Sequence, residues 1–237
     1  LGYKELNWNL GCPYPMVTKS GMGSGLICNP TRINDVLHKA HNESDIVVSM
    51  KMRMGYEHAG EILDAFSVLD QYPLKNIAIH ARVGKQLYKG PVDLDAFEKC
   101  ITATKHKLYY NGDITSVDDA AQALAVSGAD GVLIGRGTYG RPWFPNQVRH
   151  FLATGVRLAD PTLAVKFSTI LRHYDAMLDH YGVHHGLKIA RKHLGWYSKG
   201  LPNSAELRSK IMRADDPAVV KGMLNQFFEP IIGREAA

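Results

Sequence analysis

Short apolar runs rich in β-branched residues recur along the first 140 residues, and longer amphipathic stretches separate them. The runs are Lys4–Leu10, Ile46–Met52, Asn76–His80, Leu108–Tyr110 and Gly131–Ile134. Their carboxyl ends follow one another at intervals of about 24 to 39 residues, which is the spacing of consecutive β–α units. The pattern therefore predicts a parallel sheet whose strands are joined by helices.

The stretches between the runs carry helix signals. Ser116 is a suitable N-cap with Asp119 three residues later, and Gly128 suits the left-handed position at the end of the same helix. A second helix is predicted to open at Pro30, because proline is favoured at the first helical position. The expected buried stripe of the Ser116 helix consists of Val117, Ala120, Ala121 and Leu124.

The pattern changes after residue 140, where no further strand run appears. Apolar residues recur at helical spacing over residues 163–181, and Gly182 ends this pattern. Asp160 followed by Pro161 predicts a cap and a first helical residue for this long helix.

Two more helices are predicted at Leu187–Tyr197 and Pro217–Phe228. The change from alternating runs to helices alone predicts a domain boundary. We expect an α/β domain over residues 1–140, which would hold the chemistry, and a helical domain over residues 141–237.

Composition narrows the class of protein. The 237 residues include 28 Lys and Arg against 23 Asp and Glu, a net charge of +5. This is an ordinary globular composition, which excludes disordered, collagen-like and disulfide-scaffold proteins, and no apolar run reaches the roughly 18 residues of a membrane span. The three cysteines lack metal-ligand spacing, so we expect no metal site and a reducing, cytoplasmic setting.

The positive charge is concentrated in one half of the chain. Residues 141–237 hold 14 basic and 8 acidic side chains, whereas residues 1–140 hold 14 basic and 15 acidic ones. Such asymmetry favours a polyanionic partner, although solvated basic surfaces are also common.

Candidate chemistry lies at the carboxyl ends of the predicted strands, the edge at which parallel α/β folds bind ligands. Cys12, in a turn made by Gly11 and Pro13, is either a nucleophile or proton donor, or a small buried residue. Lys51 is either the partner of an anion or a lysine that reaches solvent. His80 is either a structural hydrogen-bonding residue or part of a site.

Two glycine-containing turns follow the last two predicted strands. They contain Asn111, Gly112 and Asp113, and then Gly135 and Arg136. Glycine lets backbone N–H groups approach a phosphate, and the arginine adds a charged fork. Because a barrel of this type often binds phosphate after its last two strands, the pair predicts a phosphorylated ligand.

In their order along the chain, these motifs resemble those of the tRNA-dihydrouridine synthases, a family of flavin-dependent TIM-barrel enzymes. The matching segments are Asn9–Pro13, Gly21–Leu26, Lys51–Gly55, Ile79–Arg82, Asn111–Ile114, Gly128–Arg136, Gly140–Trp143 and Ile189–Tyr197. The resemblance implies a TIM (β/α)8-type barrel followed by an all-helical C-terminal domain that binds tRNA. It also implies the reduction of uridine in tRNA to 5,6-dihydrouridine, with FMN as cofactor and NADPH as reductant.

The resemblance implies roles for individual residues. Cys12 matches the catalytic cysteine that gives a proton to C5 of the uracil after hydride from reduced FMN adds at C6. Thiols are mostly protonated at neutral pH, so a cysteine can act as this acid. Lys51 and His80 match flavin contacts, and Asn111, Gly112, Asp113, Gly135 and Arg136 match residues that hold the FMN phosphate and ribityl chain. The candidate tRNA contacts are Arg82, Arg191 and Lys192, whereas Trp196 and Tyr197 are expected to pack in the helical core.

The chain also departs from the family pattern. Five predicted strands cannot close an eight-stranded barrel, so we expect a partial barrel, and we expect a monomer. Two other readings stay open. One is a flavoprotein like dihydroorotate dehydrogenase that acts on a small molecule, and the other is a non-catalytic RNA-binding fragment.

Overall fold

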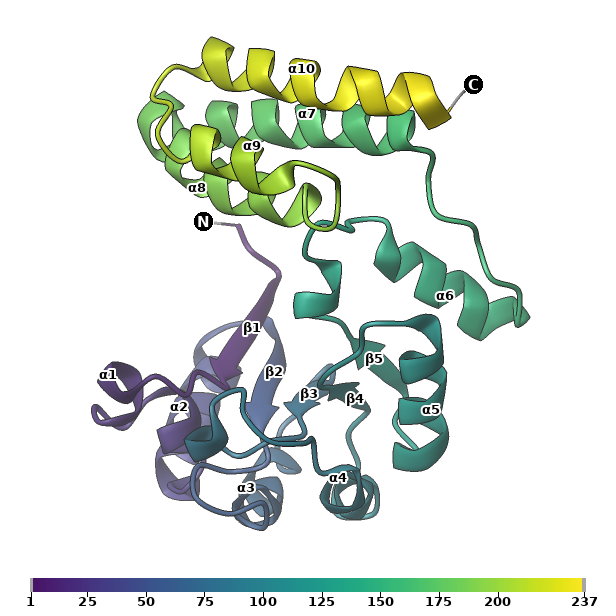
Figure 1. The fold of residues 1–237 in the computed structure, drawn as a ribbon. Helices are drawn as coiled ribbons and strands as arrows, with labels where there is room; N and C mark the ends of the chain where they lie inside the picture. Colours follow the sequence, from purple (N-terminus) through teal and green to yellow (C-terminus); the bar gives the residue numbers. More distant parts are fainter. Residues whose placement is uncertain (1, 236–237) are drawn as a thin grey trace. The chain divides into compact units, whose positions relative to one another are not determined.

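The computed structural model describes residues 2–235, and the chain forms two compact units (Figure 1). The first unit is Leu1–Gly137 and the second is Thr138–Ala237. This division falls a few residues before the boundary that the sequence pattern predicts.

The first unit is a five-stranded parallel sheet with helical connections, which confirms the predicted fold class. Its strands are β1 (Glu5–Leu10), β2 (Val47–Arg53), β3 (Ile77–His80), β4 (Leu108–Asn111) and β5 (Gly131–Leu133), in the spatial order of the sequence. Its helices are α1 (Pro15–Thr18), α2 (Pro30–Glu43), α3 (Glu61–Leu69), α4 (Leu94–Ile101) and α5 (Val117–Ser127), with 3-10 turns η1 (Gly23–Leu26), η2 (Gly84–Gln86) and η3 (Arg136–Thr138). Sequential parallel pairing is the arrangement of strands in a TIM barrel.

The two faces of the sheet differ in burial. On β2, Val48, Met50 and Met52 are buried, whereas Lys51 on the opposite face is half-buried. Because side chains alternate along a strand, the apolar residues pack against the surrounding helices, which follow the outside of the sheet in Figure 1. The Lys51 face is therefore the inner face of the sheet.

Local signals explain the helix ends. Ser116 caps α5 together with Asp119, and Gly128 takes the left-handed conformation at its end, both as predicted. The predicted buried stripe is partly wrong, because Ala123 and Ser127 are buried with Ala120, whereas Ala121 and Leu124 are only half-buried. Small residues on this face let α5 lie close to its neighbours β4, β5 and α4.

In its described residues, the second unit consists of helices joined by loops and contains no strand. Its helices are α6 (Phe144–Thr154), α7 (Leu163–Tyr181), α8 (Val183–Tyr197), α9 (Ser204–Ile211) and α10 (Pro217–Glu235). Four of them enclose one apolar core, which includes Phe167 and Tyr174 of α7, Leu194 of α8 and Phe228 of α10.

The predicted start of α7 is wrong. Its N-cap is Thr162, whose hydroxyl accepts from the backbone N–H of Val165 at 3.4 Å. The Asp160 carboxylate instead accepts from the side chains of Gln147 and Lys166. Helix α9 was not predicted from the sequence, because eight residues give too short a pattern to read.

Candidate active site

The strand ends bring the predicted site residues of the first unit to one edge of the sheet. Cys12 follows β1, and Lys51 lies two residues before the end of β2. His80 and Asn111 are the last residues of β3 and β4, and they are paired in register. Since Arg53 is paired with His80 in the same way, adjacent strands present these side chains side by side on the inner face.

The turn that carries Cys12 is fixed by hydrogen bonds on several sides. The N–H of Gly11 donates to Oδ1 of Asn9 at 3.0 Å. The backbone N–H and the hydroxyl of Ser24 both donate to the carbonyl of Cys12, at 3.0 and 3.1 Å. Nε of Arg53 donates to the carbonyl of Gly11 at 3.0 Å. The thiol itself is free and half-buried, so its position is set by a rigid turn.

Arg53 connects this turn to the segment that follows β3. Its side chain is 1% exposed, and Nη1 donates to the carbonyls of Val83 at 3.0 Å and Leu87 at 2.6 Å. Its guanidinium also lies 5.2 Å from the ring centre of Tyr88. Neither Arg53 nor Tyr88 is among the site residues that the sequence predicts. For Arg53 the sequence offers one signal, because alternation along β2 places it on the same face as Lys51.

Burial changes the charge states of the neighbouring groups. Burial, and then the charge of Arg53, lower the pKa of Lys51 to about 8. Burial and the charges of Arg53, Lys51 and Arg82 lower the pKa of His80 to about 3, so its ring is neutral near pH 7. Because Arg82 can only donate, its 3.2 Å contact with Nε2 of His80 makes Nε2 the acceptor and leaves the ring proton on Nδ1.

Asp113 bridges two arginines from different turns. Arg82 forms a forked ion pair with both carboxylate oxygens, and Nη2 of Arg136 donates to Oδ1 at 2.7 Å. The hydrogen bond from Arg82, with the charges of both arginines, lowers the pKa of Asp113. Gly112 beside it has φ +149°, and a Cβ there would lie 2.6 Å from Cγ1 of Val92. The backbone therefore packs closely at this turn, and only glycine fits it.

The remaining predicted phosphate-site residues lie at the same edge. The side-chain amide of Asn111 donates to the carbonyl of Leu133 at 2.8 Å, so it joins β4 to the end of β5. Gly135 is exposed and directly precedes Arg136, and a Cβ at Gly135 would meet no atom within 4 Å. This turn therefore has open space in front of its backbone.

The charge balance of the site is positive. Lys51, Arg53, Arg82 and Arg136 lie around it, and among these described neighbours Asp113 is the acidic partner. Buried cations in excess of carboxylates favour an anionic ligand, because burying a charge without a partner is costly.

The candidate tRNA contacts fall into three different environments. Arg82 is 2% exposed and donates to Asp113 and to the carbonyl of Gly90, so its guanidinium already has partners within the first unit, and its contact with tRNA stays a prediction. Arg191 lies in the second unit and donates to the carbonyl of Ala214 and to Asp215. Lys192, in the same helix, is exposed and stays a candidate.

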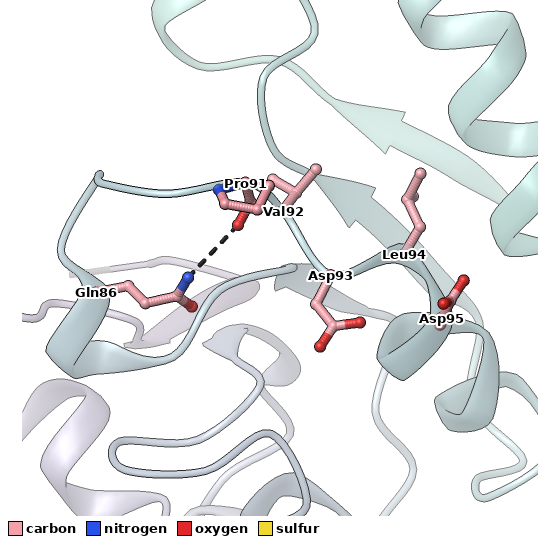
Figure 2. Close-up of a pocket in the computed structure, with 6 residues that line it drawn as sticks. All are labelled: Gln86, Pro91, Val92, Asp93, Leu94 and Asp95. Carbon is pink, nitrogen blue, oxygen red and sulfur yellow. Dashed lines mark hydrogen bonds between the residues drawn. The ribbon is translucent and has the colours of Figure 1, made fainter.

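A separate hollow of about 350 Å³ lies beside the segment that follows β3 (Figure 2). Its six lining residues are Gln86, Pro91, Val92, Asp93, Leu94 and Asp95. None of the predicted site residues lines it. In Figure 2 the amide of Gln86 reaches the carbonyl of Pro91. The Asp93 carboxylate caps α4 by accepting from the N–H of Ala96 at 2.8 Å. These polar groups therefore serve the local fold.

Neither a metal-binding cluster nor a membrane-spanning helix occurs in the described residues 2–235. No group of three or more His, Cys, Asp or Glu side chains there is placed to hold a metal ion. None of the helices in that range combines the length and hydrophobicity that crossing a membrane requires.

Comparison with known proteins supplies the family. Residues 1–232 match the family model "Dihydrouridine synthase (Dus)". The chain is 36% identical over 236 residues to the "Probable tRNA-dihydrouridine synthase" of Rickettsia bellii, covering 99% of this chain and 72% of that protein. It is 34% identical over 233 residues to the "tRNA-dihydrouridine synthase B" of Xanthomonas campestris pv. campestris, covering 98% of this chain and 70% of that protein. A family match over nearly the whole chain, joined to relatives above 30% identity, shows that this chain belongs to the dihydrouridine synthase family.

Proposed function

We propose that this chain reduces uridine in tRNA to 5,6-dihydrouridine, with FMN bound at the strand ends and NADPH as the reductant. The observation that carries the proposal is the positive edge of the sheet, where the fixed Cys12 turn, Lys51 and the Arg82–Asp113–Arg136 network lie on neighbouring strands. Family membership supports tRNA uridine as the substrate, since relatives carry that activity in their names.

The residues present fit FMN. Lys51 has a lowered pKa, so an adjacent anion would relieve the cost of its buried charge, and a reduced flavin ring is such an anion. Arg136, with the glycine turns at Gly112 and Gly135, suits a phosphate group. Bound FMN would supply the hydride that adds at C6 of the uracil.

The chain's own groups would complete the reaction. Cys12 would donate the thiol proton to C5, and its fixed turn would hold the sulfur in place during the transfer. Lys51 would hold the negative charge on the ring side of the cofactor, and neutral His80 would contribute a hydrogen bond there. Asp113 would keep Arg82 and Arg136 oriented for the phosphate side.

The second unit would bind the tRNA backbone. Its excess of basic side chains favours a polyanion, and exposed Lys192 is a candidate contact. Arg191 would act indirectly, because its guanidinium already holds the loop at Ala214 and Asp215. With tRNA as substrate we propose a cytoplasmic site of action. A monomer stays a prediction.

Replacing the thiol tests the function. Unmodified tRNA, NADPH and the FMN-loaded chain are incubated, and dihydrouridine is measured by mass spectrometry of nucleosides. We expect Cys12→Ala to lower kcat by about 100-fold or more, which is the usual effect of removing a general acid, while tRNA still binds.

Cys28→Ala is the matched control, because Cys28 is an exposed free cysteine that lies outside the site. It should retain wild-type turnover. Dihydrouridine formation by Cys12→Ala at the wild-type rate would refute the proposed proton donor. A wild-type chain that reduces a free pyrimidine but no tRNA would favour the small-molecule reading.

A further inference from the structure

The second unit contains its own pocket, which the proposed reaction does not use. A cavity of about 300 Å³ opens between the segment before α6, the start of α7 and the end of α8. Its lining includes Tyr139, Trp143, Lys166, Trp196 and Lys199. All of these residues belong to the same compact unit, so the pocket is a feature of one rigid part of the chain.

One donor in the pocket is buried without a well-placed acceptor. Nε1 of Trp143 is shielded from solvent and meets no partner at good hydrogen-bond geometry. The indole interacts with the Asp160 carboxylate, but Gln147 at 3.0 Å and Lys166 at 2.9 Å already hold that carboxylate. A fully unsatisfied buried donor costs about 1–3 kcal/mol, so a better-placed acceptor brought by a ligand would recover part of this cost.

The pocket also has a fixed aromatic wall. The rings of Tyr139 and Trp196 are stacked, with centres 3.8 Å apart and planes 7° from parallel. Gly140, the next residue, also lines the pocket. Its φ is +71°, and a Cβ there would lie 2.6 Å from the carbonyl oxygen of Trp196. This close approach holds the Tyr139 segment against the end of α8. Tyr139 remains 48% exposed, so part of its ring is accessible.

The charge of the lining is positive. It contains the cations Arg141, Lys166 and Lys199 and the single carboxylate Asp160, which is paired with Lys166. A flat aromatic wall, a buried N–H donor and the exposed cation Lys199 together suit a ligand that is planar, rich in acceptors and anionic.

We propose that this pocket binds one unpaired nucleotide of the RNA substrate. The base packs against the Tyr139–Trp196 stack, an oxygen of the nucleotide accepts from Nε1 of Trp143, and Lys199 contacts the phosphate. The choice of RNA among planar anions rests on the proposed function, whereas the pocket and its chemistry do not. The pocket is therefore a second contact for tRNA, separate from the reacting uridine.

Two substitutions test the pocket in the full chain. Tyr139→Leu removes the accessible stacking ring, and Lys199→Gln removes the phosphate contact. Stacking of one base is worth about 1–3 kcal/mol, so we expect Tyr139→Leu to weaken the binding of a tRNA transcript by about 5-fold or more. Tyr139→Phe keeps the ring and should bind as the wild type does. Lys188→Gln is the charge-matched control, because Lys188 is an exposed lysine of α8 that does not line the pocket.

Intrinsic fluorescence gives an independent readout. Two of the three tryptophans, Trp143 and Trp196, line the pocket, and the third, Trp8, lies in β1. In a Trp8→Phe chain, a short single-stranded oligouridylate should therefore quench the emission, and Tyr139→Leu should reduce this quenching. The two pocket variants, Tyr139→Leu and Lys199→Gln, should both raise the KM for tRNA and leave kcat unchanged.

The outcomes separate the two proposals. Wild-type tRNA affinity and unchanged quenching in both variants would overturn the pocket proposal, whether or not dihydrouridine forms. Weakened tRNA binding in the pocket variants supports the proposal even if the wild-type chain forms no dihydrouridine, and in that case the proposed activity fails alone. A loss of binding that Tyr139→Phe does not rescue would count against stacking and overturn the proposed binding mode.

Discussion

We predict that the buried charge of Lys51 lowers the stability of the flavin-free protein and strengthens its binding of FMN. Its ammonium is half-buried beside Arg53, and its pKa falls from 10.5 to about 8. Lys51→Met keeps a similar side-chain length and removes the charge. We therefore expect Lys51→Met to stabilise the flavin-free chain and to weaken its binding of FMN.

The size of the effect follows from the pKa. A shift from 10.5 to about 8 corresponds to about 3 kcal/mol of unfavourable charge burial. Solvent reaches part of the side chain and screens the charge, so we expect about 1–2 kcal/mol. The cost is complete below pH 8, where the folded and unfolded chains both carry the proton. It declines between pH 8 and 10.5, because the folded chain loses the proton first, and it is absent above pH 10.5.

Urea unfolding of matched proteins measures this difference. Trp8 in β1 reports on the first unit when Trp143 and Trp196 are replaced by Phe in both chains. The stability gain of Lys51→Met should be about 1–2 kcal/mol at pH 7 and should shrink towards zero near pH 10.5. A variant that is less stable at pH 7, or a gain that does not change with pH, would refute the reasoning. FMN titration should show weaker binding by the variant at pH 7.

Three further changes test the fold and the site. Gly112→Ala should destabilise the first unit by about 1–3 kcal/mol in urea unfolding, because its φ is +149° and its Cβ would meet Val92; an unchanged midpoint would contradict this. Arg53→Lys keeps the charge but loses the fork that holds two loops, so kcat for dihydrouridine formation should fall about 10-fold or more with little change in KM, and an equal kcat would exclude a positioning role. Ser116→Ala should lower the stability of the first unit by about 1 kcal/mol in thermal unfolding, whereas Thr102→Ala, at a helix end without a side-chain cap, should not.

The strands and the edge of the sheet that holds the site could be predicted from the sequence. Each apolar run is short and is followed within two residues by a polar or reactive side chain. Parallel β–α units bring such ends together whatever the details of the loops. The alternation along β2 by itself separates the Lys51 face from the buried face of Met50 and Met52. These features depend on local periodicity, which a single sequence records.

The partners of the arginines could not be predicted. Arg53 is held by carbonyls of Gly11, Val83 and Leu87, and backbone carbonyls leave no trace in the side-chain pattern. The sequence makes Arg82 a candidate contact for tRNA, whereas its partners Asp113 and the carbonyl of Gly90 are seen only in the fold. The start of α7 was misjudged because Asp160 is a good cap by type but is already occupied by Lys166.

The guanidinium of Arg53 joins the carbonyl of Gly11 to the loop after β3, so the two segments are mechanically coupled. A displacement of residues 83–87 would be transmitted directly to the Cys12 turn, which lies more than 70 positions earlier in the chain. Substitutions in that loop would thus alter proton delivery without touching the thiol.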